Sequence, residues 1–416
     1  MPGKGSELRE GLSGELGEAL MESVDFDGLA ARLGRPRGER NVFEDVLGER
    51  ASGVEISDGI ERPSRTLHQL DLGSFGVDLA NRFNGQCNGY VLRVLEPAGP
   101  GLTMQSGKAR TAADGDVDWT PDVRMHVASV SKLVTAIAAR RALADAGVPG
   151  GTAIHPFLPL YWRRGPDVDQ LTFDMLLTHR SGFYNPTTDL AVYGELKGQI
   201  ARGALLGVPL GNATYQNVNF GLFRILIPVL SGAIKVSLTA PSGVEDDHDR
   251  LWEALSIQGY HDYVQQQVFA PAQLAGAATA SAPGNALAYQ WGMPGAGWDS
   301  GDLSVTSATI GWHLTAGELV RLLHAFTNGA IVPSADAWAM VESGWGVDRS
   351  KPTRAGRYFL KGGRWQSANN QLEQAVVGLL PGGLPFALLM NSQLGPDTPL
   401  LIDIVANAIE AHVVVA

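Results

Sequence analysis

Cysteine is almost absent from this 416-residue chain, and lysine is scarce. Cys87 is the single cysteine, which excludes an internal disulfide framework and a metal site shared between thiols. The chain has no His-Glu-x-x-His pattern, so the common zinc-hydrolase signature is missing. It also lacks a run of about 18 apolar residues, the length that a membrane-spanning helix needs. With 44% hydrophobic and 18% charged residues, the composition is that of an ordinary globular protein.

The charge and the N-terminal residues bear on partners and location. The formal net charge is −11, which argues against nucleic acid or an anionic membrane surface as a partner. Residues 1–7 contain no apolar segment of the kind found in secretory signals. We therefore expect a cytoplasmic protein that acts on small molecules.

One short motif offers chemistry. Ser129 and Lys132 form the chain's only Ser-x-x-Lys pattern, where a loop runs into a predicted helix that ends at Gly147. The start of a helix favours developing negative charge, and a residue three positions on lies on the same face. A serine hydroxyl needs a neighbouring base, and a lysine with a lowered pKa can accept its proton. Ser129 is thus a candidate nucleophile, although an exposed lysine at a helix start gives the same pattern.

The order of the predicted elements indicates one sheet built from both ends of the chain. Strand-like patterns lie before Ser129 and near the C-terminus, at 88–95, 102–108, 358–361, 374–380 and 386–391. The middle is mostly helical in pattern, and Asp397-Thr398-Pro399 is expected to cap a final helix through Ala411. We therefore predict three parts: an α/β domain at 73–125 and 350–416, a mostly helical domain at 126–349, and a partly helical N-terminal extension at 1–72.

Two further motifs follow Ser129 along the chain. Tyr215-Gln216-Asn217 precedes an apolar run, and Lys361-Gly362-Gly363 lies on a predicted strand. A Leu-Leu-Thr-His-Arg-Ser-Gly stretch ends at Gly182 between the first two. This ordered set resembles the serine β-lactamases and penicillin-binding-protein-like hydrolases, in the branch of class C β-lactamases, D-alanyl-D-alanine carboxypeptidases, esterases and transacylases. The resemblance covers about residues 85 to 412.

The resemblance implies a fold and three catalytic roles. The fold would be α/β (α+β), with an antiparallel sheet flanked by helices, an all-helical domain, and the active site in the cleft between them. Ser129 would be the acyl-accepting nucleophile, and Lys132 would shuttle its proton. Tyr215 would be the general base, its phenol pKa brought down by Lys132 and Lys361. The resemblance implies no metal and no organic cofactor.

The same resemblance implies substrate contacts for Asn217, Lys361, Gly363, Arg364 and Trp365. Asn217 would orient Lys132 and the substrate through its amide, and Lys361 would supply positive charge. Gly363, with Gly362, would let the substrate lie along the strand edge, and the N–H groups of Ser129 and Arg364 would form the oxyanion hole. Arg364 and Trp365 stand where the β-lactamases carry a small hydroxyl residue, and we expect this pair to crowd a fused β-lactam.

His126 and His179 are catalytic residue types, but we interpret both as structural. As isolated residues, Tyr215 could equally be a core aromatic and Lys361 a strand-edge charge. The ordered set argues against that alternative, because every position of the family pattern that bears chemistry is filled.

Three functions are weighed. The first is a cytoplasmic serine hydrolase or transacylase that acts on a small ester or amide, with an acyl donor and an amine acceptor, as in ester-to-amide exchange in natural-product biosynthesis. The second is a β-lactamase or D-alanyl-D-alanine carboxypeptidase, which shares the chemistry but works outside the membrane. The third, of another class, is a catalytically silent binding or scaffold protein with this fold.

Overall fold

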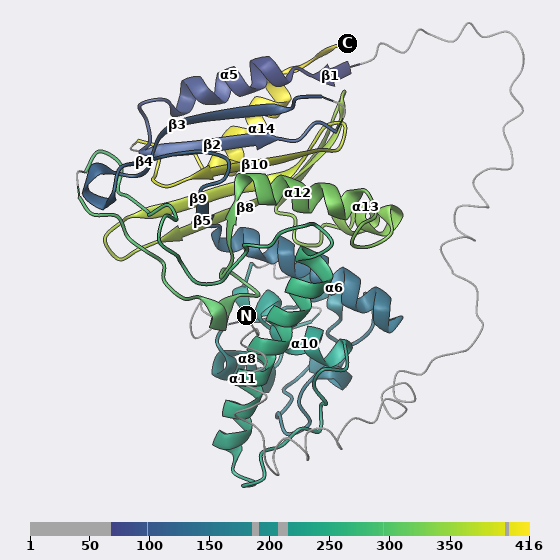
Figure 1. Ribbon diagram of the computed structural model, residues 1–416. Coiled ribbons are helices and arrows are strands. Elements are labelled where there is room, and N and C mark those ends of the chain that lie inside the picture. The colour runs from purple at the N-terminus through teal and green to yellow at the C-terminus, as the bar shows by residue number, and fades with distance from the viewer. Residues whose placement is uncertain (1–67, 98, 185–190, 207–214, 294, 396–398) are drawn as a thin grey trace, which may run out of the picture.

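The computed structural model describes residues 68–416 apart from 98, 185–190, 207–214, 294 and 396–398 (Figure 1). Most of the predicted N-terminal extension and the Asp397-Thr398 part of the predicted helix cap therefore lie outside the described residues. The last part of that extension is tied to the body of the protein. There β1 (His68–Leu70) pairs antiparallel with β11 (Val413–Val415) beside the C-terminus.

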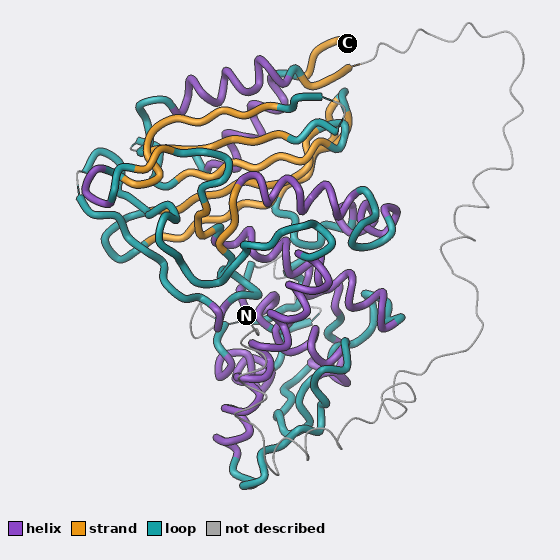
Figure 2. Tube along the Cα trace, in the orientation of Figure 1, coloured by secondary structure: helices purple, strands orange, loops and turns teal. Residues whose placement is uncertain are grey.

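A seven-stranded antiparallel sheet forms one half of the molecule, in the upper part of Figure 2. The strand order is β4-β3-β2-β10-β9-β8-β7. In that order the strands span Val117–Asp118, Leu102–Arg110, Gly89–Val94, Leu384–Met390, Leu372–Leu380, Gly356–Gln366 and Arg349–Thr353. The two ends of the chain meet where β2 pairs with β10. The predicted α/β class and antiparallel sheet are confirmed.

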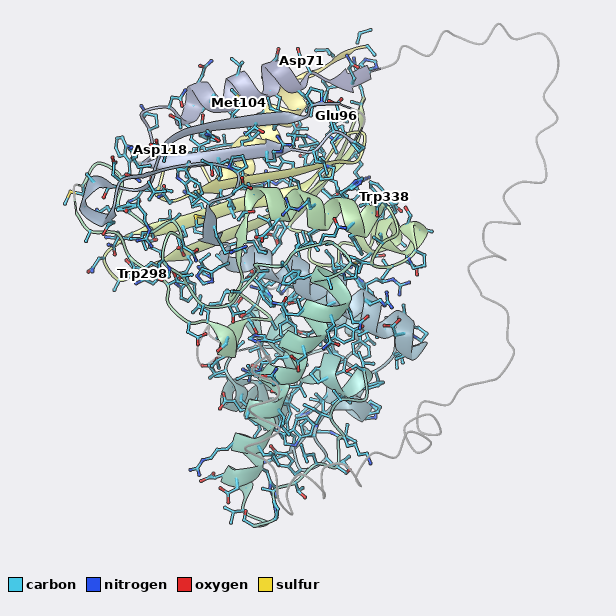
Figure 3. The ribbon with its side chains drawn as sticks, viewed as in Figure 1. Asp71, Glu96, Met104, Asp118, Trp298 and Trp338 are labelled. Carbon is cyan, nitrogen blue, oxygen red and sulfur yellow. The ribbon has the colours of Figure 1, made fainter. Side chains whose placement is uncertain are left out.

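One face of the sheet is covered by α5 (Leu72–Phe83) and α14 (Leu401–Ala411). Every second side chain along the strands, such as Leu360, is buried beneath these helices. Asp71, labelled in Figure 3, caps α5, because its carboxylate accepts the N–H of Ser74 at 3.0 Å. The cap fixes where the helix begins on the sheet.

The other face is covered by α12 (Ala316–Thr327), which packs across β2, β9 and β10. Next to it lies α13 (Ser334–Glu342), whose Trp338, labelled in Figure 3, has its ring centre 6.4 Å from that of Phe359. The core on this face is continuous with that of the helical half. Helix α12 thus packs on the sheet, although it lies within the predicted helical range 126–349.

The helical half lies below the sheet in Figure 1. Its helices are α6 (Ser131–Ala146), α7 (Phe173–Leu177), α8 (Tyr193–Arg202), α9 (Asn217–Gly221), α10 (Phe223–Leu230) and α11 (Glu245–Val264). A π-helical segment, Gln265–Phe269, follows α11. Most residues in the first turns of α6 are buried, so that helix is the central element of this half. Within the described residues, no helix has the length and apolar character needed to cross a bilayer.

Candidate active site

The segment that carries Ser129 lies at the junction of the two halves. β5 (Arg124–His126) pairs with β6 (His313–Thr315), and a 3₁₀ turn, Ala128–Val130, follows before α6 begins at Ser131. This agrees with the prediction of a loop that runs into a helix. The side chain of Ser129 is therefore presented just ahead of a long, buried helix.

The backbone of this turn is constrained. Ala128 has a φ of +48°, the left-handed region that non-glycine residues seldom adopt. Behind the turn, the Trp312 C=O accepts the Val127 N–H at 3.0 Å, and the Trp312 N–H donates to Ser131 Oγ at 3.0 Å. These bonds hold the residue before Ser129 in a conformation that the local sequence does not favour.

Ser129 Oγ lies between two titratable side chains. Lys132 Nζ is 3.0 Å from it, and the Tyr215 hydroxyl is 2.9 Å from it. Lys132 also donates to the Thr309 C=O at 3.1 Å and is fully buried, whereas Tyr215 is 48% exposed. The structure thus brings together the three residues that we predicted as catalytic.

The surroundings shift the pKa values of these groups. Burial lowers the pKa of Lys132 to about 8, with a further lowering contribution from the charge of Lys361. Burial alone would raise the pKa of Tyr215, but the positive charges of Lys361 and Lys132 outweigh it, so that pKa is lowered. The two ammonium groups lie 5.0 Å (Lys132) and 5.1 Å (Lys361) from the centre of the Tyr215 ring. The pair beside Ser129 is thereby adjusted toward losing a proton near neutral pH.

Lys361 is paired with a residue that the sequence analysis missed. Its Nζ donates to Asp348 Oδ1 at 2.6 Å. Burial lowers the pKa of Lys361, but Asp348 and Tyr215 more than offset that, so the pKa is raised and Lys361 stays charged. The pairing follows from the register of the β7–β8 hairpin, in which Arg349 faces Leu360 and the preceding residue therefore meets Lys361.

The edge of β8 beyond Leu360 is not paired with β7. The Leu360 C=O accepts the Asp348 N–H, and the Gly362 N–H donates to the Asp348 carboxylate at 3.0 Å, so both residues point their backbone groups to this edge. Backbone groups alternate sides along a strand, so the N–H of Arg364 faces the same way. The Arg364 N–H therefore points to the unpaired edge of β8, as an oxyanion-hole donor would. That role stays a prediction.

Gly363 is where β8 comes closest to the Ser129 turn. A Cβ added there would lie 2.3 Å from Val127 O, 3.1 Å from Val130 N and 3.3 Å from Ser129 N. Contacts this short with backbone atoms leave no room for a side chain. Glycine at 363 therefore lets the strand lie directly against the amide of Ser129.

Gly363→Ala is expected to lower kcat for an activated ester by about 10²-fold, since a shift of about 1 Å in catalytic geometry has that effect. Gly362→Ala is the matched control. Its Cβ would meet Ile402 Cδ1 at 3.5 Å, an ordinary contact, so the loss should be far smaller. Steady-state kinetics of the two variants with one ester test this, and equal losses would contradict the importance of the close approach.

The remaining residues that were predicted to contact the substrate do not lie together. Trp365 lies on the same face of β8 as Lys361, with its ring centre 6.2 Å from that of His126. Arg364 lies on the opposite face with Gly362, and its Nη2 donates to Gln366 Oε1 at 3.1 Å. Its side chain therefore does not join Trp365 as expected, because neighbouring strand residues point to opposite faces. Asn217 is half-buried at the start of α9, two residues beyond Tyr215.

Comparisons with known proteins bear on this arrangement. The sequence profile described as Beta-lactamase matches residues 101–248, a range that contains Ser129, Lys132 and Tyr215. The chain has the β-lactamase-like fold. The predicted resemblance is thereby confirmed, and the family consists mostly of serine hydrolases with this Ser-x-x-Lys motif. Among curated protein sequences, none matches the chain.

Solved structures with the β-lactamase-like fold overlay most of the chain. A D-amino acid amidase from Ochrobactrum anthropi, complexed with L-phenylalanine amide, has a TM-score of 0.55 and 18% identity over 82% of this chain and 98% of its own. A D-stereospecific amidohydrolase from Streptomyces has a TM-score of 0.58 and 17% identity, and the match covers 81% of this chain and 98% of its own. FmtA from Staphylococcus aureus has a TM-score of 0.59 and 12% identity, and the match covers 91% of this chain and 97% of its own. At these identities the likeness concerns the fold.

Two histidines border the site of this β-lactamase-like fold. His179 stacks on Tyr215 with ring centres 4.3 Å apart, and its Nδ1 accepts the N–H of Gln216 at 3.3 Å. Burial, then the charges of Lys361 and Lys132, lower the pKa of His179 to about 3, so it stays neutral. It supports the ring of Tyr215, in agreement with the structural role that we predicted.

His126 forms a buried pair that the sequence did not predict. Its Nδ1 lies 2.6 Å from Glu373 Oε2, and its Nε2 contacts the C=O of Ile310. Both ring nitrogens thus face oxygen atoms of neighbouring elements. Burial raises the pKa of Glu373, against the lowering effect of His126. The pair fastens β5, just before Ser129, to β9 of the sheet.

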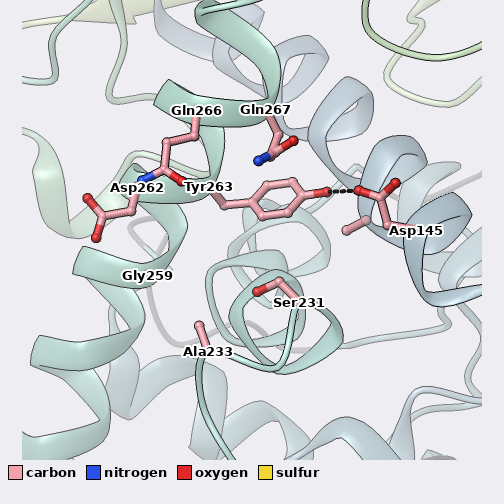
Figure 4. A pocket seen from close by; sticks show the side chains of 9 residues that line it. Asp145, Ser231, Ala233, Gly259, Asp262, Tyr263, Gln266 and Gln267 are labelled. Carbon is pink, nitrogen blue, oxygen red and sulfur yellow. Dashed lines mark hydrogen bonds between the residues drawn. The ribbon is translucent and has the colours of Figure 1, made fainter.

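A surface pocket of about 440 Å³ lies elsewhere, between α6, α10 and α11 (Figure 4). Tyr263 projects into it and donates to Asp145 at 3.3 Å, with Gln266 and Gln267 nearby. Asp145 is in the last turn of α6 and Lys132 in the first, about 20 Å apart along the helix. This pocket is therefore separate from Ser129. No group of three or more His, Cys, Asp and Glu side chains in the described part of the chain is arranged to hold a metal ion.

Proposed function

We propose that the protein is a serine acyl-enzyme hydrolase or transacylase acting on small esters or amides. The observation that carries the proposal is the position of Ser129 Oγ, 3.0 Å from Lys132 Nζ and 2.9 Å from the Tyr215 hydroxyl. These are distances for direct proton transfer between a nucleophile and its base. A binding protein with this fold would have no need of a lysine kept near a pKa of 8 beside a buried serine turn.

The reaction proceeds in two steps. In the first, Ser129 Oγ forms a bond to the substrate carbonyl carbon, and its proton passes to the Lys132–Tyr215 pair. That pair returns the proton to the leaving alcohol or amine as the scissile C–O or C–N bond breaks. In the second, water or an acceptor amine bonds to the acyl carbon and gives its proton to the same pair, which passes a proton to Ser129 Oγ as the bond between that oxygen and the acyl carbon breaks. An amine that binds where water is excluded turns hydrolysis into acyl transfer.

The side chains beside the β8 edge favour an ester or amide over a β-lactam. Gly362 and Gly363 offer no hydroxyl to a substrate carboxylate, and the ring of Trp365 occupies the site face of the strand. An amidase with this fold has been crystallised with an amino-acid amide, which supports small amides as a substrate class for the proposal. Exchange of an ester for an amide, as in natural-product biosynthesis, is the transacylase form of the same reaction.

Side-by-side kinetics test the substrate class. We expect kcat/KM for an aryl acetate or butyrate to exceed that for a chromogenic cephalosporin by more than about tenfold, a difference of about 1.4 kcal/mol in barrier. We also expect added amines to divert part of the acyl-enzyme to amide, which product analysis by mass spectrometry will show. Cephalosporin turnover as fast as ester turnover would favour the β-lactamase or carboxypeptidase alternative. Partitioning that no amine alters would leave an esterase.

A further inference from the structure

The Lys361–Asp348 ion pair is oriented with its ammonium inward. The side chain of Lys361 is 2% exposed, whereas that of Asp348 is 29% exposed. Lys361 Nζ is 2.6 Å from Asp348 Oδ1, while Oδ2 of the same carboxylate accepts the Gly362 N–H. A molecule that reaches this end of the site therefore meets a carboxylate before it meets the ammonium.

The loop that carries Asp348 is held firmly against the catalytic helix. Gly346 has a φ of +67°, and a Cβ there would lie 2.9 Å from Ala136 Cβ and 3.4 Å from Lys132 O. The Gly346 N–H donates to the Leu177 C=O at 3.2 Å. Asp348 follows two residues later, so its position is fixed by packing on α6 rather than by the ion pair alone.

Three other titratable groups near the site, Lys132, His179 and Arg364, do not offset the negative charge that Asp348 presents to a substrate. Lys132 is fully buried and bonded to Ser129 and the Thr309 C=O. His179 is neutral because burial and the nearby lysines lower its pKa to about 3. The side chain of Arg364 lies on the other face of β8 with that of Gln366. Of these groups, Asp348 is thus the one that offers an accessible charge, at the edge of β8 beside Lys361.

We propose that Asp348 is a specificity-determining residue that selects uncharged or cationic acyl donors and rejects donors with a carboxylate close to the reacting carbonyl. A substrate carboxylate could pair with Lys361 only by lying beside the Asp348 carboxylate, and like charges at such distances in a partly buried site repel strongly. An ammonium group there is attracted instead. The proposal rests on the proposed acyl-enzyme function, since it concerns the donor that acylates Ser129.

Three matched esters test the proposal: p-nitrophenyl pentanoate, its analogue ending in a carboxylate and its analogue ending in a trimethylammonium group. In the unaltered protein, kcat/KM for the carboxylate ester should be at least about tenfold below that for pentanoate, and the cationic ester should equal or exceed pentanoate. Asp348→Asn keeps the shape and an acceptor for the Gly362 N–H. It should raise the carboxylate-to-pentanoate ratio by about tenfold and lower the cation-to-pentanoate ratio.

Ratios within one variant cancel any general loss of catalysis, including one caused by the altered partner of Lys361. Glu410→Gln is the matched control, because Glu410 is also paired with a lysine of the same sheet, Lys351 on β7. Its ratios should equal those of the unaltered protein. If Asp348→Asn does not fold, the unaltered protein is measured at increasing salt concentration instead. Screening should then raise the ratio of kcat/KM for the carboxylate ester to that for pentanoate.

The outcomes separate this proposal from the function on which it rests. Equal kcat/KM for the carboxylate ester and pentanoate, or the same ratio shift in Glu410→Gln as in Asp348→Asn, overturns the role of Asp348 and leaves the acyl-enzyme function standing. If none of the three esters reacts and a fluorophosphonate does not label Ser129, both the role of Asp348 and the acyl-enzyme function are overturned.

Discussion

Ser129→Ala is expected to lose covalent labelling by a fluorophosphonate and to turn over an aryl ester about 10⁶-fold more slowly, the loss seen when a catalytic serine is removed. The fold should survive, because the change deletes one hydroxyl, Lys132 keeps its bond to the Thr309 C=O, and the half-exposed Tyr215 can bond to water. Intact-mass measurement after labelling, followed by peptide mapping, gives the direct test.

Ser131→Ala is the matched control for this variant. Its hydroxyl lies two residues away but accepts the Trp312 N–H at 3.0 Å and is buried. We expect this variant to keep its label at Ser129 and to be somewhat less stable. An acyl adduct that still forms on another residue in Ser129→Ala would remove Ser129 as the nucleophile. Absence of any adduct on the unaltered protein would favour the scaffold alternative.

Lys132→Ala and Tyr215→Phe should each lower the acylation rate by about 10²–10⁴-fold, the usual contribution of a general acid–base group. The double variant should lose little more than the worse single variant, since both groups serve one proton transfer from Ser129. Stopped-flow measurement of the acylation rate of the unaltered protein, the two single variants and the double variant gives this double-mutant cycle. Tyr184→Phe is the control, because its hydroxyl bonds to the Arg202 C=O outside the catalytic group.

The same network predicts a pH profile. Lys132 has a pKa of about 8, and only its neutral form can accept the Ser129 proton. With an ester that does not itself titrate, kcat/KM should rise with pH and level off above about pH 8. In Lys132→Ala, this rise of kcat/KM with pH should disappear. Losses that add fully in the double variant would mean that Lys132 and Tyr215 act in separate steps. A rate that is flat from pH 6 to 9 in the unaltered protein would mean that Lys132 is not the group that accepts the Ser129 proton.

The structure brings Ser129, Lys132 and Tyr215 within hydrogen-bond distance, as the sequence predicted, because part of this group is local. Ser129 and Lys132 are one turn apart, so helix geometry alone brings them together. Tyr215 is far along the chain, and it was found through the order of the motifs, not through spacing. The family resemblance was therefore needed to place it beside Ser129.

The residues that were missed depend on strand register and loop packing. Asp348 meets Lys361 because of where the β7–β8 turn falls, and Thr309 meets Lys132 because a loop folds back behind α6. Neither contact leaves a periodic pattern in the sequence. Arg364 is a different case: the two-residue period of a strand already separates it from Trp365, and treating the two as one pair ignored that period.

The domain boundaries stay a prediction, but the sequence did not show that α12 packs on the sheet. Helix α12 has a capping box, in which Thr315 and Glu318 bond to each other's backbone, and its amphipathic pattern was visible. Such a pattern shows that a helix has a buried face but not whether a sheet or another helix covers it. The N-terminal helices expected within 1–67 lie outside the described residues, and the cytoplasmic location stays a prediction.

The central pairing of the sheet has a consequence for how the protein is made. β2 and β10 are neighbours, yet the bond between the Asn88 N–H and Ser392 Oγ at their ends spans 304 residues. On the ribosome, β2 emerges long before β10, so the edge of β2 that pairs with β10 stays unpaired while the whole helical half is synthesised. Contacts of such high sequence separation slow folding and leave an open strand edge exposed to other chains. Until the last strands arrive, the partners that β2 has in the final fold are β3 and α12.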